Sequence, residues 1–404
     1  MSTLRTLLGL ARLALARAGA ALRPVGVVSP LGGIVALLAV SSGLAGALLG
    51  WPEFTYLALT LAAGLLVAFA FLVGRARFRV EIELTPRRVV AGERAFGRLL
   101  LANSGTRRST PTRIELPVGQ GVAEFGIPAL EAQAQHEELF AVPTARRSVI
   151  VAGPAVSVRG DALGLVRRVV RWSDPVELFV HPATIRLRPS AAGLVRDLEG
   201  EVTKAITDND LAFHALRPYE PGDDRRYVHW RTTARTGRLM VRQFTETRRS
   251  QLVLLHSAEE SGYASEEEFE LGVSVLASIA QQVLRDGTRV RLASGRGELR
   301  TATVVTMLDD SSRIEPTATG ATLREFARDA TRRMPAPSVL LVVVGSRTPL
   351  AELRAVDTLF GADTRTIGLR MDAGGDPRLS SAGSLAVATV GALPDLPKLL
   401  GKLS

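Results

Sequence analysis

Residues 31–50, LGGIVALLAVSSGLAGALLG, and 54–74, FTYLALTLAAGLLVAFAFLVG, are two apolar stretches that decide the fold class of this chain. Between positions 24 and 74 the only charged residue is Glu53. A helix that rises about 1.5 Å per residue needs about 20 apolar residues to cross about 30 Å of hydrocarbon. A core helix or a signal peptide fits poorly, because neither gives two such stretches in succession. The sequence therefore predicts a transmembrane hairpin within residues 24–77.

The charges beside the hairpin predict its orientation. Arginines precede the first helix and follow the second, whereas the turn around Trp51 carries no positive charge. Because cytoplasmic flanks are rich in arginine, we expect both termini and the soluble domains in the cytoplasm. The basic segment 1–23 is either an amphipathic helix on the inner leaflet or a tail that only sets the topology.

Residues 78–185 have the pattern of a β domain. From Phe78 onward, apolar Val80, Ile82 and Leu84 alternate with charged residues, as in a strand with one buried face. Similar short runs recur between turn clusters and predict a small antiparallel sandwich. These further strands are expected at residues 98–102, 113–116, 138–142, 148–151, 155–159 and 177–180.

Residues 250–404 alternate between strand and helix patterns. The runs 251–255 and 338–344 are apolar throughout, and a capping box at Ser265 and Glu268 opens a long helix. Buried strands that alternate with helices predict a doubly wound α/β domain, with a mostly parallel sheet covered on both faces. Further strands are expected at 289–293, 366–371 and 385–390, and helices at 321–334, 350–359 and from position 394.

Residues 186–249 separate the two domains and contain the most basic part of the chain. The stretch 213–249, FHALRPYEPGDDRRYVHWRTTARTGRLMVRQFTETRR, has nine arginines and four acidic residues, a local charge of +5 out of +10 for the chain. The residues around Gly222 predict a turn, after which Asp223 or Asp224 can cap a short helix.

This stretch resembles the signature of the domain-of-unknown-function 58 (DUF58) family of bacterial membrane-anchored proteins. The motif reads Arg217-x-Tyr219-x-x-Gly222-Asp223-x-x-Arg226-x-x-x-Trp230-x-x-x-Ala234-Arg235. An upstream element is also similar to the family's pattern, and it reads Gly160-Asp161-Ala162-Leu163-Gly164-Leu165 with a later His181-Pro182. The resemblance implies a bacterial inner-membrane protein: two transmembrane helices, a β-rich segment, the signature and a von Willebrand factor A-like α/β domain.

The resemblance also implies partners rather than catalysis. Family members are commonly encoded beside MoxR-type AAA+ ATPases and transglutaminase-like membrane proteins, and they are regarded as adaptors in assembling or activating envelope-linked complexes. The chain lacks cysteine, and its only lysines, Lys204, Lys398 and Lys402, lie outside any P-loop. No catalytic motif is evident. We therefore expect a non-enzymatic adaptor that has no cofactor and depends on a partner for ATP-driven work.

The metal motif that this resemblance implies is degenerate. A von Willebrand factor A domain binds a divalent cation through Asp-x-Ser-x-Ser after its first strand, whereas this chain has His256, Ser257 and Glu259 there. Loss of the anionic aspartate predicts that no metal binds. The pair Asp309 and Asp310 could supply oxygen ligands from another loop, although acidic pairs in loops are mostly solvated.

Two interpretations of the signature remain open. Four residues could pack the β-rich part against the α/β domain: Tyr219, Trp230, Ala234 and Leu239. In that interpretation Arg217 and Arg235 are paired with Asp223 and Asp224. Alternatively, the arginines could face outward and bind an acidic partner. The outward-facing set would be Arg217, Arg226, His229 and Arg235.

The basic composition also permits another class of function. A protein with this charge could bind anionic lipid or nucleic acid, as an alternative to the adaptor role. The membrane anchor, the absence of a nucleic-acid motif and the acidic residues among the arginines argue against nucleic acid.

Overall fold

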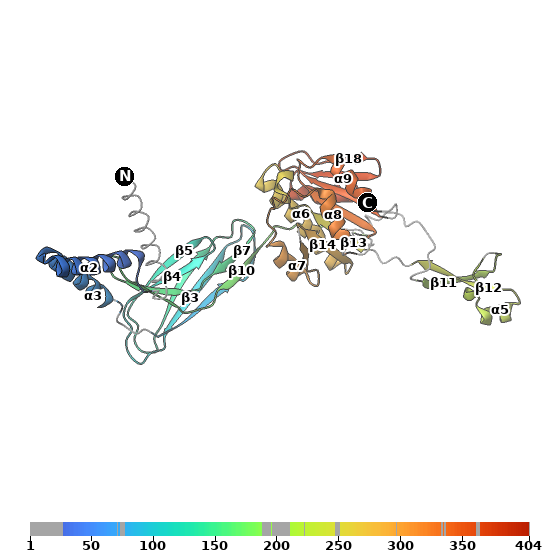
Figure 1. Ribbon diagram of the computed structural model, residues 1–404. Coiled ribbons are helices and arrows are strands. Elements are labelled where there is room, and N and C mark those ends of the chain that lie inside the picture. The colour runs from blue at the N-terminus through green and yellow to red at the C-terminus, as the bar shows by residue number, and fades with distance from the viewer. Residues whose placement is uncertain are drawn as a thin grey trace, which may run out of the picture. The chain divides into compact units, whose positions relative to one another are not determined.

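The computed structural model describes residues 27–70, 72, 77–187, 195, 211–221, 223–246, 251–295, 297–332, 334, 337–360 and 364–403 (Figure 1). Two compact units make up the chain, Met1–Val180 and His181–Ser404. The first unit contains the hairpin and the β domain and ends at Val180. The sequence placed the end of the β domain a few residues later, at position 185. The predicted basic segment 1–23 lies outside the described residues.

Two apolar helices, α2 (Pro30–Leu49) and α3 (Pro52–Ala70), form a hairpin in the first unit (Figure 1). Ser29 caps α2, and Gly50 ends it in the left-handed region at φ 70°, which glycine adopts without steric cost. Both helices are long and apolar enough to cross a membrane. The second helix is described as far as Ala70, and its predicted end at position 74 lies outside the described residues.

The β domain is a sandwich of a three-stranded sheet, β1-β3-β6, and a seven-stranded sheet, β2-β10-β7-β4-β8-β9 with β5 paired to β4. The two sheets share one hydrophobic core, in which Leu99 and Ile114 are fully buried. The strands are β1 (Phe78–Thr85), β2 (Arg88–Val90), β3 (Ala95–Asn103), β4 (Thr112–Val118), β5 (Gly121–Ile127), β6 (Gln135–Val142), β7 (Ser148–Ala152), β8 (Val156–Gly160), β9 (Arg167–Arg171) and β10 (Val176–His181).

The sequence missed β2, β5 and β9. In β5 only Ile127 is buried, and no residue of β9 is buried. Strands of this kind have no clear alternation of apolar and polar residues, which is the signal that a sequence offers for a half-buried strand. Their place in the sheet is set by backbone pairing with neighbouring strands.

The α/β domain has a seven-stranded sheet in the order β15-β14-β13-β16-β17-β19-β18. The five strands from β14 to β19 in that order run parallel, and the two edge strands run antiparallel, so the sheet is mixed. The strands are β13 (Gln251–His256), β14 (Arg289–Ser294), β15 (Gly297–Leu299), β16 (Val339–Val344), β17 (Arg365–Met371), β18 (Arg378–Ala382) and β19 (Leu385–Val390).

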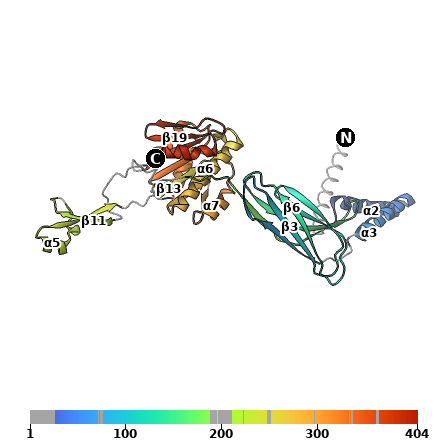
Figure 2. The same cartoon turned by 180° about the vertical axis from the view of Figure 1, so that it is seen from behind.

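Helices cover both faces of this sheet (Figures 1 and 2). In β13, Leu252 and Leu254 join one hydrophobic cluster with α6, and Val253 and Leu255 join another with α8. Burial of both faces explains why this strand is apolar throughout. The helices are α6 (Glu266–Arg285), α7 (Val304–Ser311), α8 (Leu323–Thr331), α9 (Leu350–Asp357) and α10 (Leu396–Gly401).

One expectation about this domain was wrong, because Asp309 and Asp310 lie in helix α7 and not in a loop. The helix expected at 321–334 is present as α8, with shorter bounds. The chain runs from β13 to β14 on one side and places β16 on the other, so the strand order reverses between β13 and β16. Ligands of such sheets bind beside the carboxyl ends of the strands at this reversal.

Candidate functional site

The signature motif lies in a segment that we call the arm and define as residues 211–221 and 223–246 (Figure 1). Two antiparallel strands, β11 (Leu211–Pro218) and β12 (Met240–Glu246), form its stem. The 3₁₀ helix η1 (Arg225–Tyr227) and the helix α5 (Trp230–Thr236) lie between them in sequence. The candidate residue Gly222 is outside the described residues.

An ion pair between Arg217 and Asp223 fixes the turn after β11. The Nη1 and Nη2 atoms of Arg217 donate to Oδ2 and Oδ1 of Asp223 at 2.7 and 2.6 Å. Asp223 Oδ2 also accepts the backbone N–H of Glu220 at 2.9 Å. The hydrogen bond from Arg217, reinforced by that N–H, holds the pKa of Asp223 below its ordinary value.

Two residues that lie between the signature positions act as caps. Asp224 Oδ1 accepts a backbone N–H of η1 at 2.9 Å. His229 caps α5, because its Nδ1 lies 3.3 Å from the backbone nitrogen of Thr232 and 2.8 Å from the Thr232 hydroxyl. Val228 and Val241 bridge the two sides of the arm and are 6% and 4% exposed. In this arrangement the His229 imidazole supports the start of the helix.

Most of the remaining signature side chains are exposed to solvent. Trp230 is 68% exposed, the Arg226 side chain is 88% exposed, and Ala234 and Arg235 are also exposed, whereas Tyr219 is half-buried. The arm itself therefore buries neither Trp230 nor Ala234.

Of the two ion pairs expected in the signature, only that of Arg217 with Asp223 is present. Asp224 lies 3.9 Å from Arg226, and Arg235 has no ion-pair partner in the part of the chain that the structure describes.

Replacing Arg217 with alanine is expected to loosen the arm, since Asp223 then loses the partner that holds its turn. Limited proteolysis should cut within the arm several-fold faster, while Arg242→Ala on β12 should leave the rate unchanged. Lowering the pH should likewise speed cleavage within the arm of the parent protein. The lowered pKa of Asp223 adds stability above the ordinary aspartate pKa of about 3.9, which is lost as the pH falls through the folded-state pKa. Equal cleavage of both variants would contradict this role.

The degenerate metal motif follows β13 at the carboxyl edge of the sheet. His256 is fully buried, and its Nδ1 lies 2.8 Å from the Ser294 hydroxyl. Its Nε2 lies 3.3 Å from the Tyr263 hydroxyl, which donates to the carbonyl of Ser257 at 2.6 Å. Burial, and then the charge of Glu268, raise the pKa of Tyr263. His256 therefore belongs to a packed hydrogen-bonded cluster.

Glu268 connects the start of α6 to the segment after β16. As the capping box predicts, Ser265 accepts the N–H of Glu268 at 3.3 Å. However, the carboxylate accepts the N–H of Ala264 at 3.0 Å and both the backbone N–H and the hydroxyl of Ser346, the latter at 3.1 Å. The sequence identified the cap but not the contact with Ser346, because the partner lies far along the chain.

Glu259 lines a cavity of about 410 Å³ beside the ends of β13 and β14. Burial raises the pKa of Glu259, but hydrogen bonds from the hydroxyl and backbone N–H of Thr319, at 2.9 and 3.1 Å, outweigh this effect and lower it. Glu325, Phe326 and Asp329 also line the cavity. This acidic lining disfavours anionic ligands such as phosphate.

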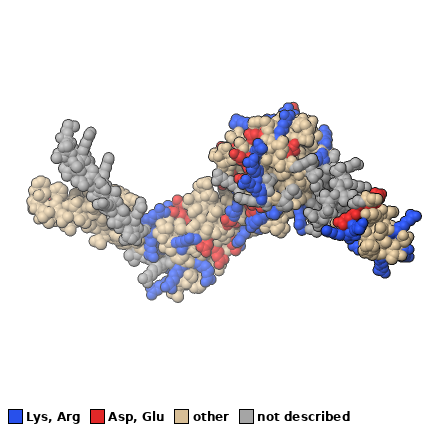
Figure 3. Space-filling model, turned by 45° about the vertical axis from the view of Figure 1, so that its right-hand side comes forward, with Lys and Arg blue, Asp and Glu red and all other residues tan. Residues whose placement is uncertain are grey.

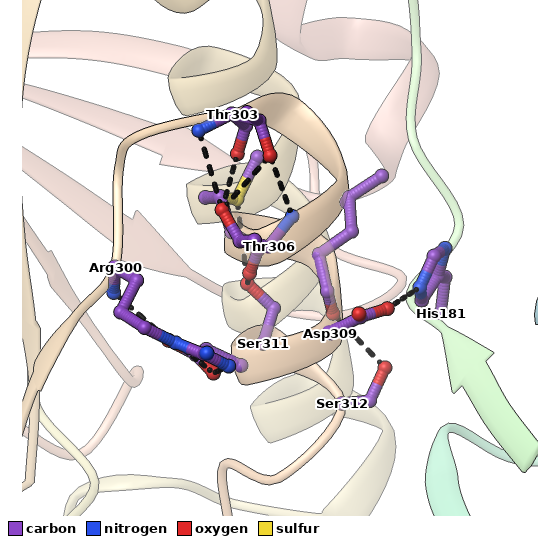
Figure 4. Close-up of polar contacts among 10 residues, drawn as sticks. His181, Arg300, Thr303, Thr306, Asp309, Ser311 and Ser312 are labelled. Atoms are coloured by element: carbon purple, nitrogen blue, oxygen red, sulfur yellow. Dashed lines mark hydrogen bonds and ion pairs between the residues drawn. The ribbon is translucent and has the colours of Figure 1, made fainter.

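Helix α7 brings His181 and Asp309 together within the second unit (Figure 4). His181 Nε2 lies 2.9 Å from Asp309 Oδ1, and both side chains are buried. The adjacent Asp310 pairs with Arg300, whose Nη2 lies 2.6 Å from Asp310 Oδ1. The two aspartates considered as metal ligands are therefore occupied by separate partners.

Titration calorimetry with Mg²⁺ and Mn²⁺ is expected to give no saturable binding tighter than millimolar. The parts of the chain that the structure describes contain no group of three or more His, Asp or Glu residues suited to a metal ion. A carboxylate is needed to offset dehydration of such a cation, and Glu259 is engaged by Thr319. Saturable binding that is lost in a Glu259→Gln variant would contradict the prediction.

The signature residues lie within a stretch of the chain that matches a known protein family. Residues 215–380 match the family described as "Protein of unknown function DUF58". This DUF58 match covers most of the arm and much of the α/β domain. A curated relative, "Uncharacterized protein YeaD" of Bacillus subtilis (strain 168), is 26% identical over 264 residues. The aligned part covers 62% of this chain and 63% of the relative, so less than two thirds of that protein is matched. Both comparisons support the resemblance to DUF58.

Solved structures show only distant similarity. The CARDB domain of a Pyrococcus furiosus protein, in complex with di-metal ions, is 13% identical and has a TM-score of 0.21, covering 26% of this chain and 88% of that chain. The alkylpurine DNA glycosylase AlkC of Pseudomonas fluorescens, bound to DNA, is 15% identical with a TM-score of 0.19, covering 33% and 40%. At these scores the similarity carries no argument about the fold or the function.

Proposed function

We propose that this protein is a membrane-tethered adaptor whose arm docks onto an acidic surface of a MoxR-type AAA+ ATPase. The observation that carries the proposal is Trp230, which is 68% exposed on a basic arm. An exposed tryptophan between arginines is the residue combination that most often dominates protein interfaces. The partner class comes from the resemblance to DUF58.

The charges of the arm support an acidic partner. Arg225, Arg231, Arg235 and Arg238 are exposed, and no described residue forms an ion pair with any of them. Guanidinium groups bind carboxylates through two parallel hydrogen bonds, and this geometry favours aspartate and glutamate side chains on the partner. The arm thus offers one exposed aromatic side chain and four exposed arginines for which no described residue is an ion-pair partner.

The small core of the arm also supports a docking role. Val228 and Val241 are its only side chains that are buried, among those described. Two-stranded sheets of this kind are marginally stable in water, and a partner that covers the arm would add buried area. Exposure of the arm would then be a property of the unbound protein.

We further propose that the α/β domain is von Willebrand factor A-like and that the hairpin anchors the chain in the inner membrane, with both termini and the soluble domains cytoplasmic. The parallel central strands and the helices on both faces support the first proposal, and the uncharged length of α2 and α3 supports the second. In this arrangement the ATPase supplies the ATP-driven work, and a transglutaminase-like membrane protein is a second proposed partner.

The experiment uses the full chain in nanodiscs with a purified MoxR-type AAA+ ATPase from the same organism. Saturable binding at micromolar concentration is expected at physiological salt, with no binding to an unrelated AAA+ ATPase. Binding to duplex DNA that weakens steeply between about 50 and 200 mM salt would instead favour the nucleic-acid alternative. A chain that enters nanodiscs but does not bind the ATPase would overturn the partner assignment.

A further inference from the structure

The turn between β8 and β9, residues 161–166, is joined to the base of the hairpin. The backbone N–H and the hydroxyl of Ser29 both donate to the carbonyl of Leu165 at 3.0 Å. The N–H of Arg167 donates to the carbonyl of Val27 at 2.7 Å. A Cβ atom at Gly32 would lie 2.0 Å from the same Leu165 carbonyl, so only glycine allows this approach. The turn and the start of α2 therefore form one rigid junction.

The apolar side of this junction places the turn close to the hydrocarbon. Leu165 and Val166 are buried with Ala68, and Val35 and Leu65 pack against them. These helix residues lie about one turn inside α2 and within the last turns of α3. Because each helix is about as long as the hydrocarbon is thick, these positions fall in the outer part of the hydrocarbon, next to the bilayer interface.

Leu163 projects from the same turn and is 73% exposed. The turn that carries it is fixed, because the carboxylate of Asp161 accepts the N–H groups of Leu163 and Val166 at 2.9 and 2.8 Å. Gly164 completes the turn at φ 70°. An apolar side chain held rigidly at this depth would transfer from water to the interface of the bilayer, which is favourable.

Two arginines face each other one pair beyond this turn. Arg159 on β8 and Arg168 on β9 are direct cross-strand partners, and like charges opposite each other destabilise a sheet. Arg159 donates to the hydroxyls of Thr110 and Thr112, to the latter at 3.0 Å, and no described carboxylate pairs with Arg168. Burial, followed by repulsion from Arg168, lowers the pKa of Arg159. Figure 3 shows Lys and Arg side chains on the β domain beside the hairpin.

We propose that this end of the β domain binds an anionic phospholipid, with its phosphate between Arg159 and Arg168 and Leu163 inserted into the surface of the bilayer. A phosphate has the charge that offsets the repulsion and the oxygens that two guanidinium groups can bind. We assign this phosphate to a lipid headgroup because the hairpin adjoins the site and because Leu163 would stay in water if the ligand were free phosphate. The proposal rests on the proposed membrane anchoring and is independent of the ATPase.

The first measurement locates Leu163 in the bilayer. Because the chain has no cysteine, Leu163→Cys allows a single fluorescent label on the full chain in liposomes. Lipids with a nitroxide near the headgroup should quench this label several-fold more than a label at Leu139→Cys. The control is matched, since Leu139 is 68% exposed but lies in mid-strand on β6.

The second measurement tests the choice of lipid. Nitroxide-labelled phosphatidylglycerol should quench the label at position 163 about fivefold more than nitroxide-labelled phosphatidylcholine, the local enrichment expected for one arginine near the surface. Adding Arg168→Gln should bring this ratio close to one. Adding Arg171→Gln should preserve it, because Arg171 lies at the other end of β9 and pairs with Asp174 at 2.9 Å.

Flotation of the liposomes separates the two ways to fail. If the protein does not float with the liposomes, both the membrane anchor and this lipid-binding surface are wrong. A protein that floats, but whose label at position 163 is unquenched or shows equal quenching by both lipids, overturns this surface alone. Micromolar binding of inorganic phosphate in phosphatidylcholine liposomes, lost with Arg168→Gln, would assign the arginine pair to free phosphate and overturn the lipid.

Discussion

Replacing Trp230 with alanine is expected to weaken binding of the AAA+ ATPase about thirtyfold or more. Truncation of a central aromatic residue at an interface costs about 2 kcal/mol or more, which corresponds to this factor. The melting temperature should stay unchanged, because Trp230 is 68% exposed in the free protein and contributes little to a core. Binding to the ATPase and thermal unfolding, measured on the same preparation in nanodiscs, check both statements.

The matched control is Leu379→Ala, which removes another exposed apolar side chain, 37% exposed on β18 of the α/β domain. It should leave ATPase binding unchanged. A second pair of variants tests the contribution of charge. Arg235→Ala should weaken binding and reduce its salt dependence, whereas Arg378→Ala on β18 should do neither. If Trp230→Ala lowers the melting temperature by several degrees, the side chain is part of a core and the docking role is wrong.

Replacing Glu268 with alanine is expected to lower the free energy of unfolding by about 3 kcal/mol or more. Glu268 is 2% exposed, and its carboxylate accepts the N–H of Ala264 and two groups of Ser346. Hydrogen bonds to a charged group contribute about 1.5–3 kcal/mol each, and the variant loses three of them. Denaturant unfolding of the parent and the variant under the same conditions measures the difference.

Glu266→Ala is the matched control on the same first turn of α6. Glu266 is exposed, so its removal should change the free energy of unfolding by about 0.5 kcal/mol or less. Glu268→Gln should lie between the two, because an amide oxygen accepts hydrogen bonds but its NH₂ group faces donors. Equal stability of Glu268→Ala and Glu266→Ala would show that the contact with Ser346 is not needed for stability.

The hairpin and the central strands could be predicted because their signal is local. An uncharged stretch such as 31–50 needs no knowledge of neighbours, since its length and composition alone match a helix of membrane thickness. β13 and β16 were recognised because burial of both faces leaves every residue apolar. β9 was not predicted because its sequence, RRVVR, lacks the alternation of apolar and polar residues. It forms a strand through pairing with β8.

The candidate site was only partly accessible from the sequence. The spacing of Arg217, Asp223 and Trp230 identified the segment, and the turn at Asp223 was expected. Which arginine pairs with which aspartate depends on side-chain positions across the arm, and Arg226 rather than Arg235 lies near Asp224. The contrast between Val228, which is buried, and Trp230, which is exposed, was not visible in the sequence, because both side chains are apolar.

The sequence by itself determined the apolar hairpin, the order of a β domain and an α/β domain, the signature motif and the absence of cysteine and of a P-loop. These features depend on composition and on spacing along the chain. Only the tertiary structure decided that Glu268 meets Ser346, that His181 meets Asp309, and that Ser29 meets Leu165 at the base of the hairpin. The reason is physical: such contacts join residues far apart in sequence, and they form only when sheet register and helix packing bring the side chains together.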